Sequence, residues 1–134
     1  MTENEIATII VDCAFKVHSV LGPGLLEHIY EVALQHELQK RGLRAERQVP
    51  FNIHYDGIQF DEGLRMDLLV GDKVIVELKS VEDIHPRHKL TTLSYLRLTD
   101  RRLGLLINFN VAYIKDGITR LANRMPEADT PTEQ

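Results

Sequence analysis

Residues 65–79 read Arg65-Met-Asp67-Leu-Leu-Val-Gly-Asp-Lys-Val-Ile-Val-Glu77-Leu-Lys79. Apolar runs on either side of Gly71-Asp72 predict two strands joined by a turn, and the rest of the fold is built around them. Buried charges cost free energy unless they are paired or bound to metal, so Asp67, Glu77 and Lys79 need an explanation. Glu77 and Lys79 are two residues apart, which places both side chains on one face of a strand.

The length of the turn decides whether Asp67 joins them. A two-residue loop pairs Val70 with Lys73 and turns Asp67 away from Glu77. A three-residue loop pairs Val70 with Val74 and places Asp67 opposite Glu77, roughly 5 Å apart at Cβ. Only the second register, or an equivalent bulge, brings the two carboxylates together.

Two neighbouring carboxylates repel each other unless a cation lies between them or one binds a proton. Oxygen ligands without His or Cys suit Mg²⁺ or Mn²⁺, which complete their shell with water and substrate phosphate. A lysine beside such an ion can orient or deprotonate water and stabilise charge on phosphate. Asp67, Glu77 and Lys79 therefore point to metal-assisted phosphodiester hydrolysis. The alternative is an ordinary sheet with a Glu and a Lys on its solvent face, because the Asp-x9-Glu-x-Lys spacing alone is a weak signal.

The composition indicates one globular domain. The 134 residues are 43% hydrophobic, enough for a sizeable core. We expect a single domain over residues 1–125 and a disordered tail at 126–134, where no core-forming pattern occurs.

Several features bear on location and partners. The single Cys13 excludes an internal disulfide framework and fits a reducing compartment. No apolar run approaches the roughly 20 residues of a membrane span, and the N-terminus lacks the pattern of a signal peptide. We therefore expect a cytoplasmic protein with no membrane contact. The net charge of −4 argues against broad, non-specific adhesion to nucleic acid.

Periodicity predicts the surrounding elements. Apolar residues at helical intervals, with capping and stop signals, predict helices from Thr2 to about Val20, from about Leu26 to near Gly42, and from His85 to about Thr99. Alternating and continuous apolar runs predict strands at 43–55, 58–70, 73–79 and 103–109, with a final hairpin built from 111–114 and 117–121. The first three strands are expected to be antiparallel, and 103–109 to lie parallel to 73–79 after the third helix.

Two residues near the start of the second helix are site candidates. Glu27 lies in the first turn, where the helix dipole by itself favours a negative charge. Tyr30 shares its face and can hydrogen-bond Glu27 or its ligand, or can instead be a core aromatic with a solvated hydroxyl.

Basic residues form three groups that either flank a surface for a phosphate backbone or are simply solvated. They are Arg41, Arg44 and Arg47; Arg87, His88 and Lys89; and Arg97, Arg101 and Arg102.

Several motifs occur in a specific order: Gly24-Leu-Leu-Glu27-His-Ile-Tyr30, Asp67, Glu77-Leu-Lys79, Tyr95-Leu-Arg-Leu98 and 103–109. Over residues 6–122 they resemble the GxxExxY protein family of the PD-(D/E)xK nuclease superfamily. The resemblance implies an α/β fold with a restriction-endonuclease-like core, in which helices flank a mixed β-sheet. It also implies an active-site set of Glu27, Asp67, Glu77 and Lys79 with Mg²⁺ as cofactor.

The chain departs from this pattern at two positions. Met66 replaces the usual proline before Asp67, which removes no ligand. Thr91 stands where relatives typically carry a glutamine four residues before the Tyr95 position. A threonine still forms hydrogen bonds but reaches less far, which affects substrate orientation rather than metal binding.

The expected function is metal-dependent hydrolysis of phosphodiester bonds in DNA, with RNA the less favoured substrate. Asp67, Glu77 and the Leu78 carbonyl are expected to bind Mg²⁺ or Mn²⁺, Lys79 to position water or stabilise phosphate, and Glu27 to hold a water or the lysine. Supporting roles fall to Tyr30 and Thr91. Many enzymes of this fold are dimers, so we expect a homodimer. The alternative is a binding module that keeps the fold but cleaves nothing.

Overall fold

The computed structural model describes residues 1–125. Its helices and strands, in chain order, are α1 (Glu3–Leu21), α2 (Glu27–Lys40), β1 (Ala45–Pro50), β2 (Ile53–Tyr55), β3 (Ile58–Phe60), β4 (Arg65–Val70), β5 (Val74–Lys79), α3 (Pro86–Leu98), β6 (Leu103–Asn108), the short 3₁₀ helix η1 (Ile114–Gly117) and β7 (Ile118–Ala122). The tail expected at 126–134 lies outside the described residues.

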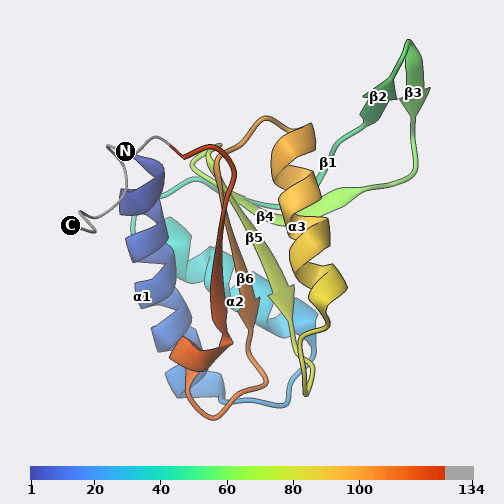
Figure 1. The fold of residues 1–134 in the computed structure, drawn as a ribbon. Helices are drawn as coiled ribbons and strands as arrows, with labels where there is room; N and C mark the ends of the chain where they lie inside the picture. Colours follow the sequence, from blue (N-terminus) through green and yellow to red (C-terminus); the bar gives the residue numbers. More distant parts are fainter. Residues whose placement is uncertain (126–134) are drawn as a thin grey trace, which may run out of the picture.

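A mixed sheet in the order β1-β4-β5-β6-β7 forms the centre of the molecule (Figure 1). β5 runs parallel to β6, and the other neighbouring strands are antiparallel. α1 and α2 lie on one face and α3 on the other, so helices flank the sheet as predicted. The α/β fold with a restriction-endonuclease-like core is therefore confirmed.

The two faces of β5 carry different side chains. Val74, Val76 and Leu78 pack in the large core with α1 and α2. Ile75 packs on the other face with Leu96 of α3. Alternation along the strand then places Glu77 on the α3 face, as the two-residue period predicts.

α3 packs closely against β6 at Gly104. A Cβ there would lie 3.2 Å from Cγ2 of Thr92 and 3.3 Å from Cδ1 of Leu96. The glycine thus lets the middle and later part of α3 come close to the sheet. Gly104 pairs with Ile75, so this contact lies near the start of β5, and the first turns of α3 extend from it toward the end of β5 that carries Glu77 and Lys79.

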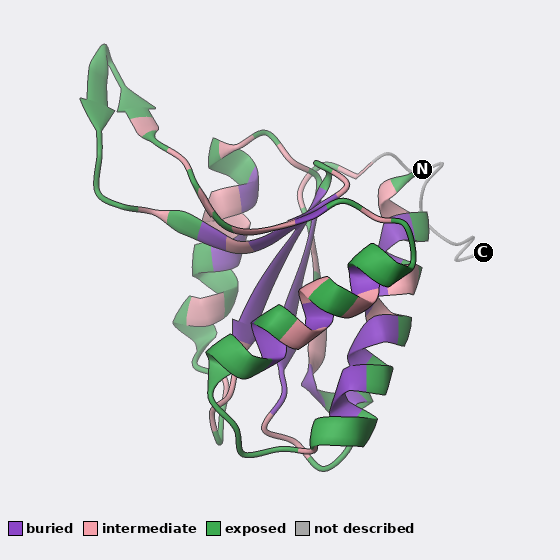
Figure 2. Ribbon diagram, turned by 180° about the vertical axis from the view of Figure 1, so that it is seen from behind, coloured by how far each residue is buried: buried purple, intermediate pink, exposed green. Residues whose placement is uncertain are grey.

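The two long strands predicted at 43–55 and 58–70 are each divided. Their inner parts, β1 and β4, pair within the main sheet, and β1 is the edge strand that contains Pro50. Their outer parts, β2 and β3, form a separate hairpin around Asp56-Gly57 that projects from the body. Residues 54–60 are exposed, and Figure 2 shows the hairpin outside the buried centre.

The prediction of a final hairpin from 111–114 and 117–121 is wrong. β7 pairs directly with β6, and residues 114–117 form η1 instead. The physical reason is that this segment packs against α1 instead of pairing with a strand. Ile114 is buried in the core on the α1 side, and the Val111 carbonyl accepts a hydrogen bond from Nε2 of His18 at 2.8 Å.

None of the helices in the described part of the chain is long and apolar enough to cross a membrane.

Candidate active site

The β4–β5 register is the one that brings the carboxylates together. Val70 pairs with Val74 and Leu68 with Val76, across a turn at 71–73. The predicted three-residue loop is therefore confirmed. Continued by one step, this register places Asp67 opposite Glu77.

Side-chain oxygens replace backbone acceptors at this point of the sheet. The Asp67 N–H donates to Oε2 of Glu77 at 3.0 Å, and the Leu78 N–H donates to Oδ2 of Asp67 at 2.8 Å. The two carboxylates are thus held between the strands by reciprocal bonds. Each keeps one oxygen that makes no hydrogen bond to the protein within residues 1–125.

The strand is locally irregular at Asp67. Met66 packs on the α3 face and Leu68 on the opposite face, although strict alternation would put both on one side. Across the ladder in β1, Gln48 has a positive φ of 54°. The irregularity frees the Asp67 backbone from the ladder, so that its N–H can bond to Glu77.

Burial makes negative charge costly at this site. It raises the pKa of Glu77 to about 8, with the neighbouring Asp67 as the second cause. Burial also raises the pKa of Asp67, although the Leu78 N–H acts in the opposite direction. A cation placed between the two carboxylates would remove this penalty.

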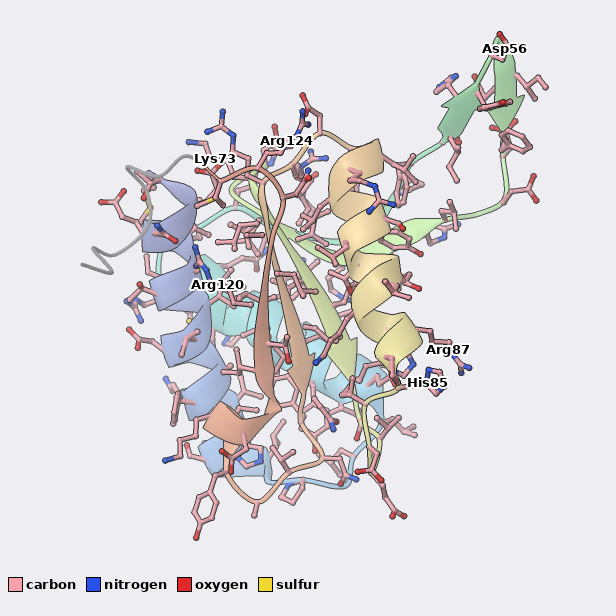
Figure 3. The ribbon with its side chains drawn as sticks, in the orientation of Figure 1. Asp56, Lys73, His85, Arg87, Arg120 and Arg124 are labelled. Carbon is pink, nitrogen blue, oxygen red and sulfur yellow. The ribbon has the colours of Figure 1, made fainter. Side chains whose placement is uncertain are left out.

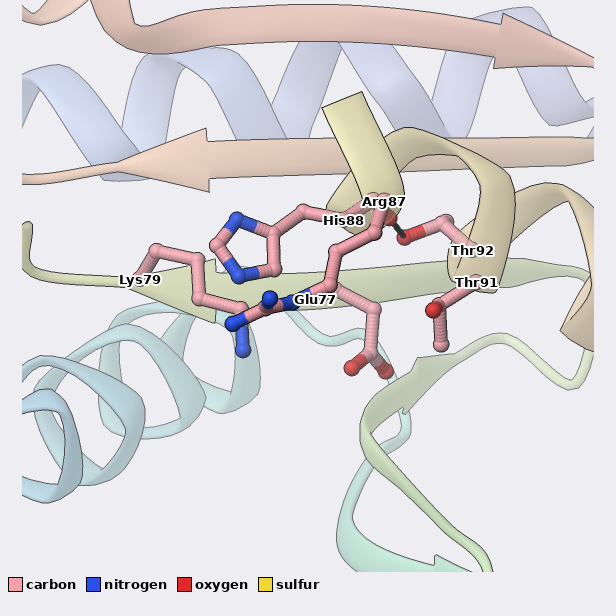
Figure 4. A pocket seen from close by; sticks show the side chains of 6 residues that line it. All are labelled: Glu77, Lys79, Arg87, His88, Thr91 and Thr92. Atoms are coloured by element: carbon pink, nitrogen blue, oxygen red, sulfur yellow. Dashed lines mark hydrogen bonds between the residues drawn. The ribbon is translucent and has the colours of Figure 1, made fainter. Parts of the chain in front are cut away.

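Lys79 lies on the same side of β5 and partly offsets the carboxylate charge. It acts to lower the pKa of both Asp67 and Glu77. Lys79 and Glu77 line a pocket of about 270 Å³ that lies between the end of β5 and the first turns of α3 (Figure 4). The rest of its wall comes from four residues of α3: Arg87, His88, Thr91 and Thr92.

Glu27 stands at the margin of this site. Its Oε2 accepts a hydrogen bond from the Ser80 N–H at 3.4 Å, just after β5 ends. The Ser80 hydroxyl donates to the Leu25 carbonyl at 2.6 Å. These contacts join the start of α2 to the end of β5. They place Glu27 near Lys79, although Glu27 itself is exposed.

Tyr30 is a core aromatic rather than a partner of Glu27. Its ring is fully buried and stacks on Phe109, with ring centroids 4.5 Å apart. Its hydroxyl donates to the Gly22 carbonyl at 2.6 Å and accepts from the Leu25 N–H at 3.1 Å. Of the two alternatives for Tyr30, the structure supports the core aromatic, with a hydroxyl bonded to the loop before α2.

Thr91 faces the site from α3. It lines the pocket with Glu77 and Lys79, at the position where the resemblance expects a glutamine. One turn further on, Tyr95 meets the edge of Phe51 with ring centroids 4.8 Å apart. Burial raises the Tyr95 pKa, and the charges of Glu77 and Asp67 add to this effect.

Sequence reasoning missed Glu31 and placed Arg47 only in a basic surface group, whereas the two side chains form an ion pair. Glu31 is buried on α2, and its Oε2 accepts from Nε of Arg47 at 2.7 Å while Oε1 accepts from Gln48 at 2.9 Å. The Glu31 charge raises the pKa of both Asp67 and Glu77. The sequence does carry a signal for Glu31, which lies one helical turn after Glu27 and next to Tyr30. A second glutamate in a helix is common, however, so this position alone does not indicate a site residue.

The donor set fits a hard divalent cation that keeps part of its water shell. No group of three or more His, Cys, Asp or Glu side chains within residues 1–125 is arranged to hold a metal. The two neighbouring carboxylates of Asp67 and Glu77 are oxygen donors, and the Leu78 carbonyl stays a predicted third ligand. Mg²⁺ and Mn²⁺ are commonly bound in this way, by few protein ligands with water and substrate phosphate, whereas zinc sites use four close N or S ligands.

Comparisons with known proteins agree with this fold. The family model described as "PD-(D/E)XK nuclease superfamily" matches residues 4–121. No curated protein matches the sequence. Among solved structures, the crystal structure of SSO0001 is similar with a TM-score of 0.55 and 21% identity, over 94% of this chain and 62% of that one. The chain thus spans less than two thirds of that protein's length.

A second solved structure is an alkaline exonuclease, LHK-Exo, from Laribacter hongkongensis. It has a TM-score of 0.42 and 14% identity, over 91% of this chain and 82% of that one.

Proposed function

The chain belongs to the PD-(D/E)XK nuclease superfamily, and from this premise we propose that it hydrolyses phosphodiester bonds in DNA with the help of Mg²⁺ or Mn²⁺. The observation that carries the proposal is the reciprocal pair of bonds that holds Asp67 against Glu77, with Lys79 on the same surface. A solvent-facing Glu and Lys on an ordinary sheet would not be held in this way. The motif of residues 24–30 supports placement in the GxxExxY family.

Asp67 and Glu77 would hold the ion through Oδ1 and Oε1, which accept no hydrogen bond from the described residues, together with the Leu78 carbonyl. When bound, a divalent ion supplies charge stabilisation to the phosphate and makes a nearby water more acidic. Lys79 would position the attacking water or bind a phosphate oxygen. Glu27, at the margin, would hold the lysine or a water. Thr91 would take a smaller part in orienting the substrate.

The chemical step adds water across one P–O bond. The water oxygen bonds to phosphorus, the bond to one sugar oxygen breaks, and that oxygen receives a proton. The products are one strand end with a phosphate monoester and one with a hydroxyl. Water is the co-substrate, and no redox partner is required.

A cleavage assay tests the proposal. Labelled single- and double-stranded DNA and RNA are incubated with the protein and Mg²⁺, Mn²⁺ or EDTA, beside Lys79→Ala and the control Lys73→Ala. Lys73 is a suitable control because it lies in the exposed turn and donates to the Met1 carbonyl. We expect metal-dependent cleavage of DNA by wild type. The cleavage rate should fall at least about a hundredfold in Lys79→Ala and stay close to that of wild type in Lys73→Ala.

The same experiment separates the alternatives. Equal cleavage by wild type and Lys79→Ala would remove the lysine from the mechanism, and cleavage of RNA alone would change the substrate. A protein that binds nucleic acid without cleaving it, and binds no metal at millimolar concentration, would be the binding module instead. The homodimer and the cytoplasmic location stay predictions.

A further inference from the structure

The proposed hydrolysis gives no role to the two basic side chains that α3 contributes to the pocket. Arg87 and His88 come from the first turn of α3 and line the same pocket as Glu77 and Lys79. In Figure 3, His85 and Arg87 lie at the end of α3 next to the end of β5. In Figure 4, the nitrogen-bearing ends of Lys79, Arg87 and His88 lie toward one end of the pocket, and the Glu77 carboxylate and the Thr91 hydroxyl toward the other.

Arg87 makes no ion pair with an acidic side chain within the described residues. Two other arginines do: Arg47 pairs with Glu31 at 2.7 Å and Arg101 with Asp72 at 2.8 Å. Lys79 offsets part of the charge of Asp67 and Glu77, but it also forms no direct ion pair within residues 1–125. The Arg87 guanidinium beside Lys79 therefore leaves positive charge available for a bound anion.

His88 is arranged to donate a hydrogen bond. Its Nδ1 accepts from the His85 N–H at 3.3 Å, which puts the proton of the neutral ring on Nε2. Burial, Lys79 and Arg87 lower the His88 pKa and so favour this neutral form. The Thr92 hydroxyl donates to the His88 carbonyl at 2.9 Å. Arg87 adds an exposed guanidinium, whose planar fork matches two oxygens of a phosphate.

The size of the pocket limits what it can hold. Its volume of about 270 Å³ lies below the roughly 300–1,000 Å³ typical of sites that enclose a drug-sized ligand. A phosphate group with a few waters fits this volume better than a nucleoside does. The pocket lining includes no Phe, Tyr or Trp, the larger aromatic side chains on which bases commonly stack.

We propose that Arg87 and His88, with Lys79 at their edge, form a second phosphate-binding subsite, which holds a phosphate of the substrate strand next to the one being cleaved. The inference rests on the proposed function and deepens it. The ligand is a phosphate carried by the strand, either an internal diester or the monoester of a 5′ end. Arg87 then sets the register of the strand relative to Asp67 and Glu77.

Binding without cleavage tests the subsite. Fluorescence anisotropy with a labelled DNA oligonucleotide in Ca²⁺ compares wild type with Arg87→Ala, Arg87→Lys and the control Arg97→Ala. Arg97 is on the same helix, is exposed, and donates to the Ser94 hydroxyl outside the pocket. We expect Arg87→Ala to raise Kd about tenfold and to lower the salt slope by about one. The Kd of Arg87→Lys should lie between those of wild type and Arg87→Ala, and the Kd of Arg97→Ala should stay within about twofold of wild type.

Chemically altered strands identify the source of the phosphate. If removal of the 5′-phosphate raises the Kd of wild type for the strand as much as Arg87→Ala does, the ligand is the phosphate of the strand end. If the Kd rises by this amount only when a neutral methylphosphonate is placed next to the scissile position, the ligand is the internal diester.

Equal Kd values for Arg87→Ala and Arg97→Ala overturn the subsite, as does the absence of binding by wild type. Neither result depends on cleavage. If Arg87→Ala and Arg97→Ala both cleave DNA with the same KM, the proposed nuclease activity is supported and the proposed subsite is excluded. In an active enzyme, we expect Arg87→Ala to raise KM much more than it lowers kcat.

Discussion

The backbone N–H of Asp67 donates to Oε2 of Glu77 at 3.0 Å, so each of the two acids is bonded to the strand that carries the other. This relationship holds two acidic side chains together between the strands, with Lys79 as a nearby basic residue. It also explains why the β4–β5 ladder stops at Leu68 and Val76: the carboxylates take the place of the next backbone acceptors. The acids are therefore part of the sheet as well as candidate ligands.

Asp67→Asn should remove metal binding while keeping the fold. The amide oxygen can still accept from the Leu78 N–H, but the negative charge is lost. We expect calorimetry to show Mg²⁺ or Mn²⁺ affinity at least about tenfold weaker, with a thermal midpoint close to that of wild type. Asp83→Asn, an exposed acid after β5, should bind metal like wild type. Equal metal affinity in both variants would exclude Asp67 as a ligand.

Stability without metal should fall as pH rises through the neutral range. The folded pKa of Glu77, about 8, lies above its ordinary value of 4.5. Between these two values the unfolded chain has lost the proton that the folded protein keeps, so the free energy of unfolding decreases as pH increases. The decrease should be complete above the folded pKa and amount to a few kcal/mol at most, since each unit of pKa difference corresponds to about 1.4 kcal/mol.

Urea unfolding at pH 5 to 9 measures this effect. Glu77→Gln should flatten the pH profile because its side chain does not titrate. Mg²⁺ should restore stability most at the alkaline end, where Glu77 is ionised. The same slope in wild type and Glu77→Gln would assign the pH dependence to other groups.

The parts of the fold that follow from local patterns were predictable. The apolar runs around Gly71 predicted β4, β5 and the turn between them, and the requirement that Asp67 meet Glu77 selected the register that the structure has. The order of strand, helix and buried strand predicted the parallel pairing of β5 with β6. The third helix begins where Pro86 predicts, with His85 as its N-cap. Each of these rests on residues that are close in sequence.

The misses depend on contacts between distant parts of the chain. The Val111 carbonyl accepts a hydrogen bond from His18, which lies 93 residues away in the sequence, so the segment after β6 packs on α1 rather than forming a strand. Glu31 is buried because Arg47 reaches it from an adjacent strand. Such partners are invisible to periodicity, which reports only that a position faces inward or outward.

Tyr30→Phe should destabilise the loop before α2. The hydroxyl joins the Gly22 carbonyl and the Leu25 N–H, and its loss leaves both without that partner. We expect the free energy of unfolding to fall by about 1–2 kcal/mol, with the stacking on Phe109 retained. Tyr55→Phe, in the exposed hairpin, is the control and should change it by less than about 0.5 kcal/mol. A similar loss in both variants would mean that the buried hydroxyl has no special role.

Arg47→Met should cost more stability than Lys16→Met, although both break an ion pair of similar length. The Arg47 to Glu31 distance is 2.7 Å, and the Glu31 side chain is only 7% exposed. Lys16 lies 3.0 Å from Glu37 but is 56% exposed, so solvent screens that pair. Removing Arg47 leaves a buried carboxylate whose charge acts on Asp67 and Glu77. We expect a loss of about 2–3 kcal/mol for Arg47→Met in urea unfolding, and a clearly smaller loss for Lys16→Met. Adding Glu31→Gln to Arg47→Met should recover part of the loss, because the unpaired charge is then gone. A double variant no more stable than Arg47→Met would show that lost packing, rather than the unpaired charge of Glu31, causes the effect.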